Sequence, residues 1–268
     1  MPTPLHVRVL EVLFPLRFQL ARMTKYAPIR RIIAKLYFEH DDMVYVPKDT
    51  VISMNRSIAP QESLVVPSRL VEYFVDQAEH RWVMNFCICR EAADCQDYPK
   101  NLGCLFLGEA SRHIDSRLGR SVSKKEALEH LRACREAGLV HLIGRNKLDA
   151  VWLKVKPAEK LMTICSCCPC CCLWLMLPKL DEQISAKVAK MPGVDVTIGD
   201  DCIGCGICVD TCFVGAIALE KDRAVINGDC RGCGRCAEVC PQGSITLHIS
   251  DNALGQTIEK IEKSVDVR

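Results

Sequence analysis

Two cysteine runs decide the fold of the C-terminal region: CIGCGICVDTC over residues 202–212 and CRGCGRCAEVCP over residues 230–241. Both runs space their cysteines as C-x2-C-x2-C-x3-C, and the second begins 28 residues after the first. The similarity extends beyond the cysteines, because Ala216-Ile217 and Ser244-Ile245 are also 28 residues apart. The pattern indicates a duplicated half-module.

The spacing within each run suits a cluster of metal ions. Two-residue gaps let successive thiolates occupy three corners of a cube, and Gly204 and Gly234 permit the tight backbone that this requires. Structural zinc uses two C-x2-C pairs, whereas triple runs with a remote fourth cysteine suit two interleaved iron–sulfur clusters. The predicted ligands of two 4Fe-4S clusters are Cys202, Cys205, Cys208, Cys212, Cys230, Cys233, Cys236 and Cys240.

These motifs resemble the bacterial-type ferredoxin with two 4Fe-4S clusters, over roughly residues 194 to 250. The resemblance implies that three cysteines of each run bind one cluster and that the fourth reaches the other. One implied set is Cys202, Cys205, Cys208 and Cys240, and the second is Cys230, Cys233, Cys236 and Cys212. Phe213 stands where the family usually has proline, a change that leaves ligation intact but alters the packing near one cluster.

The chain has nineteen cysteines among 268 residues, an odd number that includes the run Cys170-Cys171-Cys172. Adjacent cysteines rarely have the geometry for a disulfide, so the pattern favours metal binding in a reducing compartment, and we expect a cytoplasmic protein. Cys134 is expected to be a buried residue of a capped helix. The other ten predicted metal ligands are Cys87, Cys89, Cys95, Cys104, Cys165, Cys167, Cys168, Cys170, Cys171 and Cys172.

These ten cysteines form two groups about sixty residues apart, which we expect tertiary folding to bring together. They suffice for two more 4Fe-4S clusters, for one cluster with spare thiols, or for a larger iron–sulfur assembly. We expect at least one further cluster that uses Cys89, Cys95, Cys104 and one or more of the cysteines from 165 to 172. Neighbouring cysteines project differently, so the run 170–172 is not expected to chelate one iron.

The arginines and histidines near these cysteines are not expected to bind metal. We expect Arg90 and Arg112 to be solvated at the surface, although either would serve as a local cation. His80, His113 and His141 are expected to be hydrogen-bonded structural residues rather than ligands. A redox-active thiol or disulfide is an alternative for the N-terminal cysteines, because a nearby cation favours the thiolate and a disulfide beside a cluster can accept electrons.

Three N-terminal segments extend the resemblance. The stretches 85–90 (NFCICR), 103–108 (GCLFLG) and 165–172 (CSCCPCCC) look like those of ferredoxin-fused iron–sulfur proteins from anaerobic bacteria and archaea. The resemblance implies iron–sulfur binding across residues 80–250 and names neither a reaction nor a partner.

Residues 1–36 form a basic amphipathic segment with seven lysines and arginines and only one acid, Glu11. This local charge of +6 interrupts any apolar span, so we expect helices that lie on an anionic membrane surface or dock on an acidic partner, or that simply pack on their own domain. The uncharged stretch 161–178 contains six cysteines and Pro169, and is expected to be a buried metal-binding segment rather than a membrane span.

The expected fold class is α+β, with four regions. Residues 1–42 form the basic helical segment, 43–192 a cysteine-rich mixed α/β domain, 193–250 the ferredoxin-like dicluster domain, and 251–268 a C-terminal tail. Within the second region we expect strands and loops over 43–66, a helix over 68–80, and a helix capped by Ser123 and Glu126. Residues 139–155 read as a hairpin, which would complete a winged-helix-like unit.

The leading functional hypothesis is an electron-transfer protein that relays low-potential electrons to or from an oxidoreductase partner, at the inner face of the membrane if residues 1–36 bind lipid. One alternative is a reductase with substrate or thiol chemistry at the N-terminal cysteines. Another is a cluster-controlled DNA-binding regulator, although a net charge of +2 gives no global attraction to nucleic acid. No dinucleotide or P-loop motif is present.

Overall fold

The computed structural model describes residues 3–49 and 66–268, and its fold is mixed α+β, as the sequence predicts. The central sheet has seven strands in the order β4-β2-β3-β6-β5-β1-β7. Neighbouring strands are antiparallel except β1 and β7, which are parallel. The strands of this sheet are β1 (Asp42–Tyr45), β2 (Arg81–Met84), β3 (Leu105–Leu107), β4 (Gly119–Ser121), β5 (Val140–Arg145), β6 (Met162–Cys167) and β7 (Val188–Lys190).

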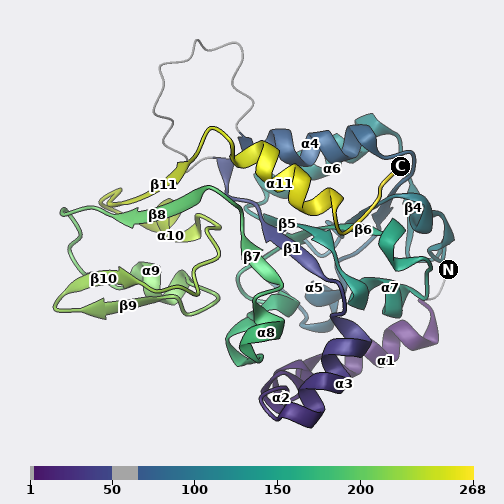
Figure 1. The fold of residues 1–268 in the computed structure, drawn as a ribbon, viewed down its shortest axis with the longest axis horizontal. Helices are drawn as coiled ribbons and strands as arrows, with labels where there is room; N and C mark the ends of the chain where they lie inside the picture. Colours follow the sequence, from purple (N-terminus) through teal and green to yellow (C-terminus); the bar gives the residue numbers. More distant parts are fainter. Residues whose placement is uncertain (1–2, 50–65) are drawn as a thin grey trace.

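Helices cover both faces of the sheet (Figure 1). On one side lie α4 (Val66–Gln77), α6 (Lys124–Glu136) and α11 (Ala253–Glu262). The other side carries α1 (Leu5–Leu13), α2 (Arg17–Met23), α3 (Ala27–Tyr37), α5 (Ile88–Ala92), α7 (Lys147–Leu153), α8 (Glu182–Ser185) and the 3-10 helix Leu173–Lys179.

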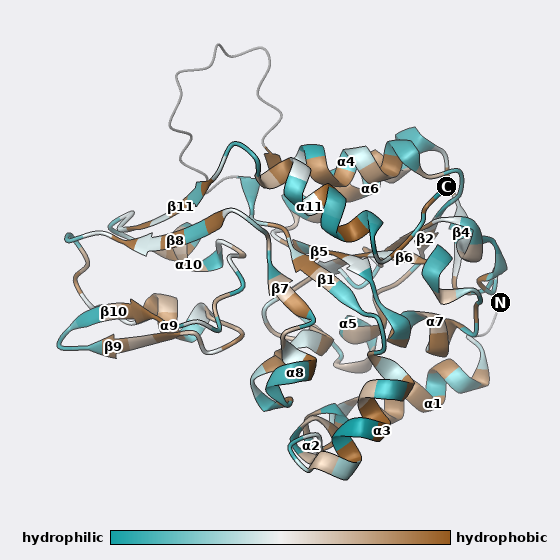
Figure 2. Cartoon of the chain, in the orientation of Figure 1, coloured by the Kyte–Doolittle hydropathy of each residue, from teal (hydrophilic) through white to brown (hydrophobic). Residues whose placement is uncertain are grey.

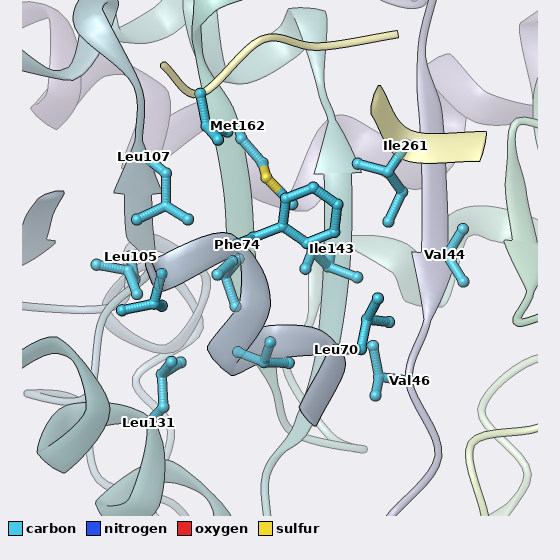
Figure 3. Packing of buried hydrophobic residues seen from close by; sticks show 14 of the residues in the cluster. Val44, Val46, Leu70, Phe74, Leu105, Leu107, Leu131, Ile143, Met162 and Ile261 are labelled. Atoms are coloured by element: carbon cyan, nitrogen blue, oxygen red, sulfur yellow. The ribbon is translucent and has the colours of Figure 1, made fainter. Parts of the chain in front are cut away.

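Strand alternation builds an apolar core under the first helical layer. Ile143 and Met162 point toward α4, where they pack with Leu70 and Phe74, and Ile261 of α11 closes the same cluster (Figure 3). Each such side chain contributes about 1.5–3 kcal/mol when it is fully buried. This core fixes the sheet without using any cysteine.

The opposite face of the sheet carries thiols. Side chains on a strand alternate between faces, so Cys165 and Cys167 share one face of β6 while Met162 and Ile164 share the other. Tyr45 of β1 lies in the same cluster as Cys167. The sheet therefore separates a purely apolar core from a cysteine-lined one.

The helix predicted from the capping box is confirmed. Ser123 accepts a hydrogen bond from the backbone of Glu126, the Glu126 side chain accepts one in return, and Gly138 follows the helix with φ +75°. The predicted hairpin is wrong: residues 140–145 form β5, but residues 147–153 form α7. Asn146 precedes α7 in an extended conformation and begins a helix instead of a turn, so no winged-helix unit is formed.

Other predicted segments differ in detail. The helix predicted over 68–80 is α4, which begins at Val66. The stretch predicted as strands and loops over 43–66 contributes β1, and its residues 50–65 lie outside the described residues. Residues 1–36 contribute three short helices, as their apolar spacing predicts. None of the described helices is long and apolar enough to cross a membrane.

Residues 194–249 form a separate lobe, here named the cysteine module (Figure 1). Its elements are β8 (Val194–Ile198), α9 (Ile207–Thr211), β9 (Ile217–Glu220), β10 (Arg223–Ile226), α10 (Arg235–Val239) and β11 (Ile245–Ile249). Strands β8 and β11 pair from Val194↔Ile249 to Ile198↔Ile245, so the module begins and ends at one point. The expected C-terminal tail instead contains α11, which returns to the large body and packs against α4.

Candidate iron–sulfur centres

Each cysteine run of the module ends in one helical turn that begins at a left-handed glycine. Gly206 before α9 has φ +82°, and Gly234 before α10 has φ +84°. Gly204 is also left-handed, and a Cβ built there would lie 2.2 Å from the backbone oxygen of Asp222. Only glycine fits at this approach, which lets the loop fold tightly around its sulfurs.

The structure brings Cys240 to the first cysteine run. A small cavity is lined by Cys202, Cys205, Cys208 and Cys240 together. Burial raises the pKa of Cys208, and the other three sulfurs add to the rise. The remote fourth cysteine therefore lies beside the three that precede it in sequence.

Cys212 lies correspondingly beside the second run. Burial, together with the nearby sulfurs of Cys233, Cys230 and Cys212, raises the pKa of Cys236 to about 12. The amide of Ala216 lies 3.3 Å from the Cys212 sulfur. The two sets of four cysteines are thus arranged as the ferredoxin resemblance implies, and both fit the thiolate donors that a cluster requires.

The ten N-terminal cysteines separate into two groups. The first, named the six-cysteine group, lines the thiol face of the sheet: Cys87, Cys89, Cys104, Cys165, Cys167 and Cys172. Its sulfurs form a chain of contacts, from Cys87 to Cys89, from Cys104 to Cys165 at 3.8 Å, and from Cys165 through Cys167 to Cys172. Cys89 lies near both Cys104 and Cys172, which closes the chain.

The second group, named the four-cysteine group, comprises Cys95, Cys168, Cys170 and Cys171. All four sulfurs lie within 4.8 Å of one another. Cys95 therefore groups with Cys168, Cys170 and Cys171, and not with Cys89 and Cys104, as was expected from the sequence. Cys170 and Cys171, expected to point apart, have sulfurs 3.5 Å from each other because the loop after β6 turns between them.

Arg90 is buried between the two groups, so its expected solvation at the surface is wrong. Its guanidinium donates to the backbone oxygens of Ser166, at 2.9 Å, and Leu102, and its Nε has no partner among the described residues. Burial lowers the pKa of Arg90, but nearby cysteine sulfurs outweigh that effect and raise it. Arg112 is exposed, as expected.

Two further arginines reach the six-cysteine group and were not identified from the sequence. Arg235 of α10 is buried and donates to the backbone oxygen of Cys167. Arg17 of α2 lies near Cys89 and Cys172, and its buried Nε lacks a partner among the described residues. No sequence pattern distinguishes either arginine as a site residue, because Arg235 lies within a cysteine motif and Arg17 lies among other basic residues of a helix.

Tyr45 connects the six-cysteine group with the cysteine module. Its pKa is raised by burial and by Cys167, Cys172 and Cys233, which come from both parts of the molecule. Its ring lies 5.1 Å from that of Phe213 between centroids, and its buried hydroxyl has no partner among the described residues. Phe213 thus exchanges the family's proline for an aromatic contact between the two parts.

Additional contacts hold the module against the large body. The amide of Lys48 donates to the backbone oxygen of Cys233 at 3.2 Å, and the Lys48 side chain pairs with Glu238. Arg231 donates to Ser185 at 3.0 Å. These contacts all involve the second run or its helix, so one end of the module faces the N-terminal cysteines.

The remaining predicted residues have structural surroundings. Cys134 is fully buried, and burial raises its pKa to about 11. His141 is buried beside Ser166, and burial lowers its pKa to about 3. His113 is exposed and His80 is half-buried.

Comparison with known proteins agrees with this arrangement over part of the chain. Residues 201–244 match the family described as 4Fe-4S dicluster domain. No curated protein and no solved structure matches the chain. The chain therefore contains a ferredoxin-type 4Fe-4S dicluster domain over residues 201–244.

Proposed function

We propose that the protein relays low-potential electrons between a redox partner and an oxidoreductase through two 4Fe-4S clusters in the module and a third centre held by the six-cysteine group. The contact that carries this proposal is the junction at Tyr45, which lies beside Cys167 and Cys172 on one side and Cys233 on the other. Cys202, Cys205, Cys208 and Cys240 would hold one cluster, and Cys230, Cys233, Cys236 and Cys212 the other. When bound, such clusters exchange single electrons.

Positive charge beside the six-cysteine group supports a metal-loaded site. Arg90 and Arg235 are buried and Arg17 is half-buried, and they approach the group from three different elements. Each donates to a backbone oxygen. Charged groups are rarely buried unless they are paired. Metal-bound thiolates supply the missing negative charge, and cluster sulfur would accept hydrogen bonds from the free Nε atoms of Arg17 and Arg90.

The two cysteine runs of the module differ in exposure, so the relay has an outer end and an inner end. Cys205 is exposed, and the neighbouring Ile203 and Ile207 are 60% and 44% exposed. The second run instead faces the large body through Lys48, Arg235 and Phe213. We therefore assign the Cys205 end to the docking of a redox protein and the Cys233 end to internal exchange with the six-cysteine group.

Iron, acid-labile sulfide and low-temperature EPR on anaerobically purified protein test the proposal. A content of about twelve irons, with a third spin system that appears on graded dithionite reduction, is the expected result. A content of about eight irons would assign clusters to the module alone and would overturn the third centre. The dicluster assignment itself would fail if fewer than about eight irons were bound.

The N-terminal helices suggest where the relay operates. Twelve of the seventeen exposed large hydrophobic side chains of the described residues lie between Leu5 and Tyr37, and exposed basic residues lie among them. Figure 2 shows hydrophobic and hydrophilic residues side by side along α1, α2 and α3. We propose that this surface binds the anionic inner face of a membrane, which fits apolar side chains and positive charge together. Such binding would place the protein in the cytoplasm, beside membrane-bound oxidoreductases.

One observation favours reductase chemistry as a second candidate function. Cys170 is the exposed member of the ten N-terminal cysteines, and its sulfur lies 3.6 Å from that of Cys95. An accessible thiol next to a second thiol suits disulfide exchange. Turnover of a disulfide substrate by reduced protein, abolished in Cys170→Ser, would replace the relay with this function.

A further inference from the structure

The four-cysteine group is much more compact than the predicted cluster sites. The Cys170 sulfur lies 3.6 Å from that of Cys95 and 3.5 Å from that of Cys171, and all four sulfurs, with that of Cys168, lie within 4.8 Å of one another. We propose that these four cysteines bind a single metal ion of the zinc class, separate from the iron–sulfur centres.

The spacing of the sulfurs decides between one ion and a cluster. Zinc–thiolate bonds of about 2.3 Å in a tetrahedron place neighbouring sulfurs about 3.8 Å apart. In a 4Fe-4S cluster each thiolate binds a different iron, so the whole cluster separates the sulfurs. A single close pair does not decide this, because Cys104 and Cys165 of the six-cysteine group also lie 3.8 Å apart. Among the described residues, however, no three sulfurs of the cysteine module or of the six-cysteine group lie within 4.8 Å of one another. The four-cysteine group is therefore sized for one ion.

Two loops distant in sequence supply the ligands. The Cys95 amide donates to the backbone oxygen of Arg90 at 2.9 Å, which turns the chain after α5. In the loop after β6, the Cys171 amide lies 3.3 Å from the Cys168 sulfur, a contact that stabilises a thiolate. One ion would thus fasten the loop after α5 to the loop after β6, beside the six-cysteine group.

The surroundings fit a structural zinc site. Cys95, Cys168 and Cys171 are buried in a small apolar cluster with Leu139. Four thiolates around a divalent ion leave a charge of −2, and Arg90 lies beside Cys168. Zinc has no redox chemistry and prefers four tetrahedral ligands. The site would therefore fix the loops without taking part in electron transfer.

Zinc, iron and acid-labile sulfide measured together on the full-length, anaerobically purified protein test the proposal. We expect about one zinc per chain in the wild type. Cys170→Ser should lose this zinc with iron and sulfide unchanged, because Cys170 is exposed and its replacement leaves the core packing intact. Cys134→Ala, a buried cysteine of the same apolar cluster outside the group, should keep it.

Cobalt(II) exchange into the wild-type protein gives a reading that does not depend on a variant. The visible bands of tetrahedral thiolate-bound cobalt are expected, at about one cobalt per chain. Loss of about four irons and four sulfides in Cys170→Ser would place these cysteines in a cluster and overturn the proposal. Absence of zinc and cobalt binding would overturn the proposal, and a mass 2 Da below that of the four thiols would show a disulfide in place of the metal site.

The same data keep this inference distinct from the proposed relay. The relay depends on iron and sulfide held by the cysteine module and the six-cysteine group, whereas the zinc site depends on an ion without sulfide. The zinc proposal can therefore fail while the iron and sulfide contents still support the relay, and the relay can fail while zinc is still bound.

Discussion

The rings of Tyr45 and Phe213 lie 5.1 Å apart between centroids and join the sheet of the large body to the residue that follows Cys212. The Tyr45 hydroxyl is buried among sulfurs and has no partner among the described residues. A thiolate or cluster sulfur would give this hydroxyl an acceptor, and without one a buried donor costs about 1–3 kcal/mol.

Tyr45→Phe should lower the reduction potential of the centre that receives this hydrogen bond. A hydrogen bond to sulfur stabilises the reduced, more negative state, and a difference of about 1 kcal/mol corresponds to roughly 40 mV for one electron. EPR-monitored redox titration measures the change. Tyr73→Phe, whose hydroxyl contacts Glu262 on the far side of the sheet, is the matched control. Identical reduction potentials in wild type and Tyr45→Phe would show that the Tyr45 hydroxyl donates no hydrogen bond to a redox centre.

Arg90→Met should empty the six-cysteine group while leaving the module loaded. Removing the cation from a buried pair costs roughly 3–5 kcal/mol, because the thiolate charge is left uncompensated. Iron analysis should show a loss of about four irons, with about eight retained. Arg112→Met, an exposed arginine, should leave the content unchanged. Full iron content in Arg90→Met would show that Arg90 does not compensate the charge of the six-cysteine group.

Paired cysteine substitutions distinguish interleaved from local ligation in the module. Cys202→Ala with Cys240→Ala should remove one cluster and about four irons, because both residues belong to one set. Cys202→Ala with Cys212→Ala affects both sets and should perturb about eight irons. Iron content and EPR signals of the two double variants are compared. The reverse order of losses would show that each run binds its own four-cysteine cluster.

Asp41 should give the free energy of unfolding a dependence on pH between about 4 and 7. Burial raises its pKa to about 7, although the Lys147 amide, Lys187 and Arg145 oppose the rise and Asp149 adds to it. In this window the folded protein keeps the proton that the unfolded chain releases, so stability falls as pH rises and stays low above pH 7. The penalty is about 4 kcal/mol.

Asp41→Asn should therefore flatten the melting temperature between pH 4 and 7 and raise it above pH 7. The amide oxygen can still accept the hydrogen bond from the Lys147 backbone, which spans 2.7 Å in the wild type. Asp251→Asn, at an exposed position, should keep the wild-type slope. An unchanged slope in Asp41→Asn would assign the pH dependence to other groups.

The basic surface of the N-terminal helices should bind anionic vesicles. Each basic residue near such a surface contributes about 1 kcal/mol, so three substitutions should weaken binding about 100-fold. The test set is Arg8→Gln, Arg22→Gln and Arg31→Gln, all exposed. Sedimentation with phosphatidylglycerol vesicles measures the binding, and neutral phosphatidylcholine vesicles should retain little of the wild type.

A charge-matched control separates this surface from general attraction. Its substitutions are Arg112→Gln, Lys125→Gln and Lys263→Gln, exposed residues outside the N-terminal helices α1, α2 and α3. It should bind anionic vesicles like the wild type. Equal weakening in both triple variants would contradict a specific lipid-binding surface, and absence of wild-type binding would exclude it.

Local sequence rules predicted elements whose residues interact with near neighbours. The capping box at Ser123 and the glycine at position 138 define α6 within one helix. The cysteine runs identified the module because its spacing is itself the motif. The hairpin prediction failed after Gly144, because the residues that follow Asn146 are compatible with a helix as well as with a strand, and they form α7.

The arrangement of the N-terminal site depends on contacts that no local pattern encodes. Cys95 and Cys170 are 75 residues apart, and only the loops after α5 and β6 bring them together. Arg90 looked like a surface residue because charge usually indicates exposure, yet its burial follows from the sulfurs around it. The contact between Tyr45 and the module also depends on Phe213, which stands where the family pattern has proline. Its partner, Tyr45, lies in a distant strand, so no local pattern in the sequence indicated the contact.

The module is attached to the large body at one place in the fold. Val194 and Ile249 are paired across β8 and β11, so the chain leaves the large body and re-enters it at the same place. The return segment, α11, still completes the core beside α4. Because the large body is complete on both sides of this insertion, one iron–sulfur unit could be exchanged for another of different potential, provided that the facing contacts at Tyr45, Lys48, Cys167 and Ser185 are refitted.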